Sequence, residues 1–172
     1  ASNNKKLIGG NLMTSFVSTI PSTEKNFGYT INKNGTPIVY GSGVDNIDKT
    51  YRSKIEESVI KIMALDVNNG FNYGYDFGSG FNADVSCVRT QSDGKIIALG
   101  PFITSYNGVP CGKIVRLNTD GSIDNTFTPP TILISSTDLK CEIQSTDKII
   151  LYGGGFTLGS SYNIARLNAN GT

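Results

Sequence analysis

Three side chains with oxygen donors stand close together in NTDGSID, residues 118–124. Asn118, Asp120 and Asp124 have the amide and carboxylate oxygens that bind Ca²⁺ in helix–loop–helix sites. That pattern also needs a glutamate at its twelfth position, and none follows here. We therefore interpret Asp120 and Gly121 as a β-turn and Asp124 as a cap on its own backbone. The sequence predicts no metal site and no cofactor.

Carboxylates also gather in residues 42–61, which contain Asp45, Asp48, Glu56 and Glu57. Two facing carboxylates could hydrolyse a glycosidic bond if their environments separated their pKa values. Lysine and arginine residues alternate with these acids, a pattern that is typical of a solvated loop or short helix whose charges pair with one another. A carboxylate-dependent glycosidase is therefore only a remote alternative.

Other catalytic groups are scarce in this chain. Its 172 residues include no histidine, so the commonest general base is absent. No GxSxG motif supplies a serine nucleophile, and we predict no catalytic residue and no enzymatic activity. The net charge is +1 and the 15 basic residues are scattered, which argues against nucleic acid as a partner. The apolar runs are too short to span a membrane.

The candidate binding residues are tyrosines and one asparagine: Tyr51, Tyr73, Tyr75, Tyr106 and Asn107. Tyrosine together with Asn, Gly and Asp is the composition of adaptable recognition loops, and it suits a sugar-binding surface. Residues 71–77, FNYGYDF, show this composition most clearly. A cell-surface glycan is the ligand class that these side chains would fit. The alternative is that they belong to a repeated core and line its turns.

The three cysteines, Cys87, Cys111 and Cys141, form no CxxC motif. An odd number of cysteines favours free, partly buried thiols. A disulfide such as Cys87–Cys141 is conceivable, but the spacing gives it no support. The redox compartment of the protein is therefore left open by the sequence.

Hairpins must position most of these residues. Three segments of eleven residues align without a gap: INKNGTPIVYG (31–41), TQSDGKIIALG (90–100) and IQSTDKIILYG (143–153). Each has a polar stretch, a turn, a β-branched run and a final glycine, and this order predicts a hairpin. The first two have a turn glycine, at Gly35 and Gly94. The third has Thr146 and Asp147 instead, so we expect a different turn type there.

A further strand is predicted after each hairpin, and it sets the period. Residues 114–117 (IVRL) and 164–167 (IARL) alternate as in a strand with one buried face. Leu65 recurs as Leu117 after 52 residues and as Leu167 after 50. Such a period, with several short strands per unit, is typical of propeller blades. The sequence thus predicts an all-β, propeller-like array of about three antiparallel, multi-stranded blades with a period of about 50–60 residues.

The repeats divide a single domain, residues 1–172, into approximate units 11–71, 72–121 and 122–172, with an insertion at 42–61 in the first. A propeller typically needs at least four blades to close. We therefore expect the array to be an excerpt of a larger propeller or to be closed by oligomerisation. In either case a blade needs neighbours to bury its apolar faces.

Residues 80–127 resemble one unit of the delta-60 repeat family, a bacterial and phage β-propeller-like repeat. The shared motifs are GFN (80–82), QSDGKI (91–96), YNG (106–108), RLN (116–118) and DGSIDNTF (120–127), and GGGFT (153–157) recurs in the last copy. The likeness covers residues 78–172 well and residues 7–77 weakly. It implies a propeller-like fold and a place in a large surface, secreted or virion-associated protein. The 42–61 insertion, Pro101 and Thr146-Asp147 depart from the repeat.

The resulting prediction is a non-catalytic structural or interaction module of a larger surface or virion protein, such as a phage tail or fibre component or a bacterial adhesin. Its partners would be other protein chains or further repeats of the same protein, and its location would be extracellular, on a bacterial surface or in a phage virion. The alternative is a carbohydrate-binding, lectin-like propeller.

Overall fold

Short antiparallel strands make up the computed structural model of the chain. It describes residues 27–31, 37–41, 62–64, 78–134 and 138–172. The described residues contain strands and turns but no helix, and thus no helix that could cross a membrane. The predicted 42–61 insertion, the 71–77 segment and the turn at Asn34-Gly35 lie outside the described residues.

Three sheets, which we call blades 1, 2 and 3, follow one another along the chain. Blade 1 consists of β1 (Phe27–Ile31), β2 (Pro37–Gly41) and β3 (Ile62–Ala64) in that order. Blade 2 consists of β4 (Cys87–Thr90), β5 (Ile96–Leu99) and β8 (Ile114–Leu117). All pairings are antiparallel, and each sheet lies within one predicted repeat.

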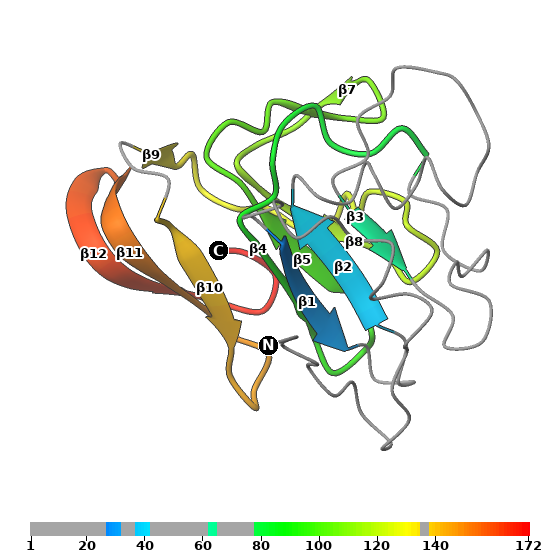
Figure 1. Cartoon of the computed structure of the whole chain (residues 1–172). Coiled ribbons are helices and arrows are strands. Elements are labelled where there is room, and N and C mark those ends of the chain that lie inside the picture. Colours follow the sequence, from blue (N-terminus) through cyan, green and yellow to red (C-terminus); the bar gives the residue numbers. More distant parts are fainter. Residues whose placement is uncertain (1–26, 32–36, 42–61, 65–77, 135–137) are drawn as a thin grey trace, which may run out of the picture.

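Blade 3 has the same order, with longer second and third strands. It consists of β10 (Lys140–Ile143), β11 (Ile149–Leu158) and β12 (Ser160–Leu167), and the short β9 (Leu133–Ile134) also pairs with β11. A separate two-stranded hairpin, β6 (Ser105–Tyr106) and β7 (Val109–Pro110), is inserted between β5 and β8. The first strand of blade 2, β4, lies beside the first strands of the other two blades, β1 and β10 (Figure 1).

All three predicted hairpins are confirmed. Their strands pair in equivalent registers, with Ile31 opposite Pro37, Thr90 opposite Ile96, and Ile143 opposite Ile149. The β-branched run after each turn therefore forms the second strand of its blade. This position suits the run, because branched side chains pack well on a pleated surface that is covered by neighbours.

The expectation of a different turn in the third hairpin is wrong. In the second hairpin the N–H of Gly94 donates to the carbonyl of Gln91, and Gly94 has a φ of 90°. In the third, the N–H of Asp147 donates to the carbonyl of Gln144, and Asp147 has a φ of 60°. Aspartate is one of the few residues that tolerate this left-handed backbone, so it replaces glycine without changing the turn.

Blade 2 is buried on both faces. Ile38 of blade 1 packs with Val88, Ala98 and Val115 on one face. The other face has Cys87, Ile97, Leu99 and Ile114, and these side chains share a cluster with Leu151, Phe156 and Leu167 of blade 3. The sheet is thus the middle layer between two neighbours.

The third strands of blades 2 and 3 differ for this reason. Residues 114–117 are buried throughout, so the prediction of a single buried face is wrong for β8. In β12, by contrast, Leu167 is buried whereas Ile164 and Arg166 are exposed, as the alternation predicted. A strand between two layers needs no polar face, whereas a strand in an outer layer does.

Candidate functional site

The predicted binding residues are distributed unevenly. Tyr51, Tyr73 and Tyr75 lie outside the described residues. Tyr106 is 1% exposed, its ring centroid lies 4.6 Å from that of Phe81, and its hydroxyl donates to the carbonyl of Gly121 at 2.6 Å. Both ends of this side chain are thus engaged within the fold, as in the core alternative.

Asn107 is exposed, but its side-chain amide oxygen accepts hydrogen bonds from within the chain. It accepts from the N–H of Gly80 at 2.8 Å and from the hydroxyl of Ser79 at 3.3 Å. Its backbone has a φ of 50°, which asparagine tolerates better than most residues. Asn107 therefore ties the β6–β7 hairpin to the segment that leads into blade 2.

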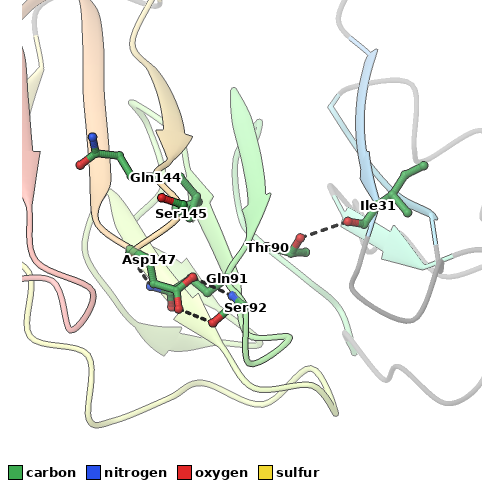
Figure 2. A pocket seen from close by; sticks show the side chains of 8 residues that line it. Ile31, Thr90, Gln91, Ser92, Gln144, Ser145 and Asp147 are labelled. Carbon is green, nitrogen blue, oxygen red and sulfur yellow. Dashed lines mark hydrogen bonds between the residues drawn. The ribbon is translucent and has the colours of Figure 1, made fainter.

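A shallow polar groove of about 340 Å³ lies where the first strands of the three blades reach their turns (Figure 2). Its lining residues come from all three blades: Ile31, Thr90, Gln91, Ser92, Ile143, Gln144, Ser145 and Asp147. None of these residues was singled out by sequence as a binding residue. The groove collects the polar turn residues of the hairpins because equivalent turns of neighbouring blades lie at the same end of the array.

Most polar atoms in this groove bind one another. Thr90 donates its hydroxyl to the carbonyl of Ile31 at 3.1 Å, which joins blade 2 to blade 1 (Figure 2). The backbone N–H of Ser92 donates to the carboxylate of Asp147 at 2.7 Å, and the Ser92 hydroxyl donates to the same carboxylate. Gln91 donates to the carbonyls of Asp147 and Ala169, both at 3.0 Å. These contacts fasten the blades to each other.

A charged pair reinforces the same boundary. The guanidinium of Arg89 in β4 binds both carboxylate oxygens of Glu142 in β10, at 2.8 and 2.5 Å. The hydrogen bond from Arg89 lowers the pKa of Glu142, so the acid stays ionised at neutral pH. Such two-point pairing fixes orientation as well as distance. It therefore sets how blade 3 lies against blade 2.

The acidic turn at 118–124 has the predicted structure and one feature that the sequence did not reveal. Asp120 accepts from the N–H of Ser122 at 2.9 Å, as a turn residue does. Asp124 accepts from the N–H of Thr126 at 2.9 Å, which confirms the predicted cap. Its other oxygen accepts from Lys95 and from Arg116, both at 2.7 Å.

These cations decide the charge of Asp124. Burial alone would raise the pKa of this carboxyl group, but hydrogen bonds from Lys95 and Thr126 and the charge of Arg116 outweigh burial and hold the pKa well below its usual range. Asp124 is thus an anion that neutralises the buried Arg116 and the half-buried Lys95. The described residues contain no group of side chains that could hold a metal ion.

The far side of blade 3 is exposed and partly apolar. Tyr152 is 37% exposed and Ile164 is 66% exposed, and the two residues are opposite each other in the pairing of β11 with β12. Arg166 on β12 is also exposed on this side, whereas Lys140 and Glu142 on β10 bond to Ser86 and Arg89 at the boundary with blade 2. We call Tyr152, Ile164 and Arg166, with the half-buried Ile150, the outer face of blade 3.

The same positions are covered in blade 2. By sequence alignment, Ile97, Leu99, Ile114 and Arg116 of blade 2 correspond to Ile150, Tyr152, Ile164 and Arg166 of blade 3. All four blade 2 residues are buried, and they lie at the boundary with blade 3. The outer face of blade 3 therefore repeats, position by position, a face that another blade covers. Only the alignment of repeats could have indicated this surface from sequence.

The order and pairing of these sheets define a class, an antiparallel array of blades as in propellers. Comparison with known families agrees with it. A family described as a domain of unknown function (DUF5122) beta-propeller matches residues 91–127 and 144–172, the hairpins and third strands of blades 2 and 3. The predicted all-β, propeller-like fold is therefore confirmed, whereas the finer likeness to the delta-60 repeat stays a prediction. No curated protein and no solved structure matches the chain.

Proposed function

We propose that this chain is a non-catalytic interaction module, a set of propeller blades that binds another blade through the outer face of blade 3. The described acids support a structural use, because Asp124 and Glu142 pair with cations and Asp120 caps its own turn. The larger protein would be a surface or virion protein, a phage tail or fibre component or a bacterial adhesin. The delta-60 resemblance supports that setting.

One observation carries the proposal: the outer face of blade 3 has the residues of an inter-blade face, but no part of the chain that the structure describes covers it. Ile164 and Arg166 occupy the positions that the buried Ile114 and Arg116 have in blade 2. Ile164 and Arg166 are nevertheless exposed. Exposed apolar groups next to a charged residue are typical of protein-binding surfaces. A blade of the same kind fits such a surface best, because blade 3 itself fits the equivalent face of blade 2.

The blade that we propose as the occupant is blade 1 of a second copy of this chain. Tyr29 in β1 corresponds by alignment to Val88, which is buried between blades 2 and 1. Tyr29 is 41% exposed, so blade 1 also presents an uncovered position on its far side. Pairing of two unlike faces is head to tail, and it closes into a ring where the rotation allows. Two copies would bring about six blades, within the usual propeller range.

Replacement of Ile164 by lysine is expected to abolish this association. Sedimentation velocity over a range of concentrations should show the mass of the wild-type chain rising above its monomer value of 18.4 kDa. Ile164→Lys should stay near the monomer mass, because a cation would be buried against apolar groups of the partner. Val109→Lys is the matched control, since Val109 is 55% exposed but lies in the β6–β7 hairpin. It should associate like the wild type.

Two outcomes would count against the proposal. A wild-type chain that stays monomeric at every concentration would show that the outer face binds no second copy. Equal weakening by Ile164→Lys and Val109→Lys would show that association depends on general surface polarity and not on this face.

A carbohydrate-binding function is the second candidate, and the polar groove favours it. Gln144 and Ser145 line the groove with exposed side chains whose amide and hydroxyl groups suit sugar hydroxyls. A glycan array separates the two functions. Glycan binding that is lost in Gln144→Ala and Ser145→Ala but kept in Ile164→Lys would favour the lectin. An array without signal would count against the lectin and favour the interaction module.

A further inference from the structure

A pair of cysteines at the boundary of blades 2 and 3 carries an inference about covalent chemistry. Cys87 in β4 and Cys141 in β10 are 54 residues apart in sequence, but their Sγ atoms lie 2.8 Å apart. Non-bonded heavy atoms pack best at about 3.5–4 Å, and a disulfide bond is about 2.05 Å long. The two sulfurs thus lie well inside packing distance, although both are free thiols here.

The backbone holds the two thiols in this arrangement. The N–H of Cys141 donates to Sγ of Cys87 at 3.3 Å, and the Cys87 thiol donates to the carbonyl of Cys141 at 3.2 Å. Arg89 lies two residues after Cys87, and Glu142 directly follows Cys141. These two residues form the two-point ion pair. The contact between the two sulfur atoms is therefore held in place by β4 and β10, which the ion pair joins.

We propose that Cys87 and Cys141 form a disulfide that joins blade 2 covalently to blade 3. The reaction needs a two-electron oxidant, for which we name a low-molecular-weight disulfide such as oxidised glutathione. In one of the two equivalent orders, the Cys87 thiolate attacks it, forms a mixed disulfide and releases one small thiol. The Cys141 sulfur then attacks Sγ of Cys87, forms the intramolecular bond and releases the second small thiol. The two released small thiols carry away the two thiol protons of the protein and the two electrons given up when the protein disulfide forms.

Packing distinguishes the two thiols. The hydrogen bond from Cys141 lowers the pKa of Cys87. The pKa of Cys141 is raised because its proton is engaged by Cys87 and because it is buried. Separation of the blades breaks this hydrogen bond, so either cysteine can attack the oxidant first in the open state.

Burial decides when the bond can form. Cys87 is 1% exposed and Cys141 is fully buried, so no small disulfide reaches them once the blades have packed. The bond must therefore form during folding, or when blade 3 separates briefly from blade 2. After packing, the same burial protects it from reductants. Such a bond suits a protein that folds in an oxidising compartment, which agrees with the extracellular location proposed above.

Among the described residues, blade 3 packs against blade 2 alone, and the bond would reinforce this interface. A repeat unit that is held by a single interface opens most easily. A disulfide closing a long loop removes entropy from the opened chain. We therefore expect oxidation to raise Tm by about 5–15 °C, given the usual effect of a native disulfide and the size of this domain.

The test uses the whole chain, unfolded and then refolded either with a reducing agent or with a mixture of reduced and oxidised glutathione. Free thiols are alkylated after denaturation, and peptides are analysed by mass spectrometry. We expect one alkylated cysteine, Cys111, and a linked pair of peptides with Cys87 and Cys141 in the oxidised sample. All three should be alkylated in the reduced sample.

Two variants complete the experiment. Cys111→Ser should keep both the linked peptides and the rise in Tm, whereas Cys141→Ser should lose both. The proposal is overturned if the refolded, oxidised wild type still has three alkylated cysteines, or if the linked peptides contain Cys111. These readouts on the wild type stand even if Cys141→Ser fails to fold.

Discussion

Replacement of Asp124 by asparagine is expected to lower the free energy of unfolding by about 3 kcal/mol, the lower end of the range for a broken buried ion pair. Asp124 is 5% exposed and Arg116 is 8% exposed, so water compensates neither charge. Asparagine keeps the shape but loses the anion that binds Arg116 and Lys95. The cost arises because the Arg116 charge stays buried without its counter-ion.

Urea unfolding followed by circular dichroism measures this loss. Asp120→Asn is the matched control, because Asp120 belongs to the same turn but is exposed and binds only Ser122. We expect that control to change stability by less than about 1 kcal/mol, as surface polar changes usually do. Equal effects of the two substitutions would refute the view that Asp124 acts by neutralising Arg116 and Lys95.

The same carboxyl group makes stability depend on pH in a defined direction. The pKa of Asp124 in the folded state is lower than its usual value of about 4 in an unfolded chain. A lowered pKa stabilises the fold above the unfolded-state pKa, and this contribution is lost as the pH falls toward the folded-state pKa. The difference in stability between wild type and Asp124→Asn should therefore be full at neutral pH and shrink below about pH 4.

Replacement of Gly153 by alanine is the second substitution with a large expected effect. A Cβ atom at this position would lie 2.1 Å from the carbonyl oxygen of Asp138, and the φ of Gly153 is 129°. The backbone would have to move, because the carbonyl oxygen of Asp138 is a backbone atom and cannot rotate away from the new Cβ as a flexible side chain could. Strained backbone costs about 1–3 kcal/mol and overpacking a similar amount, so we expect a total loss of about 3–5 kcal/mol.

Gly159→Ala separates the two causes. Gly159 also has a positive φ, of 83°, but a Cβ atom there would meet no atom within 4 Å. Gly159→Ala should therefore lower the free energy of unfolding only by the strain of the backbone, about 1 kcal/mol. Thermal unfolding of both variants gives the comparison. If Gly153→Ala were no more destabilising than Gly159→Ala, the close approach of Asp138 would have no energetic importance.

This contact explains a feature of the repeat. Each aligned hairpin segment ends in glycine, at Gly41, Gly100 and Gly153. A Cβ atom on Gly100 would lie 2.4 Å from the carbonyl oxygen of Asp84, as one on Gly153 would from that of Asp138. In blades 2 and 3 the repeated glycine thus leaves room for the backbone that enters the blade. Glycine is the only residue that allows such an approach.

The hairpins were predictable from sequence because their signals are local. The β-branched run of residues 96–99 and the glycine at position 94 determine the strand and its turn within a few residues. The alignment of the repeats also predicted the third strands. The turn at Asp147 was predicted wrongly, because a rule that looks for glycine misses an aspartate with the same backbone.

Contacts between blades could not be predicted in the same way. Cys87 meets Cys141, and Arg89 meets Glu142, across more than 50 residues of sequence. Such pairs depend on how one sheet lies over the next, which neither periodicity nor composition determines. The burial of both faces of β8 has the same origin. Tyrosine composition likewise indicated Tyr106 as a binding residue, although the fold engages its hydroxyl internally.

The central claim is that another blade covers the outer face of blade 3, and hydroxyl-radical footprinting of the wild-type chain tests it most directly. Tyr152 and Ile164 are exposed on this face, whereas Phe102, 64% exposed, lies in the turn between β5 and β6. We predict that the oxidation of Tyr152 and Ile164 falls as the chain concentration rises, while that of Phe102 does not change. Oxidation of Tyr152 and Ile164 that stays constant while the mass of the particle grows would contradict the claim.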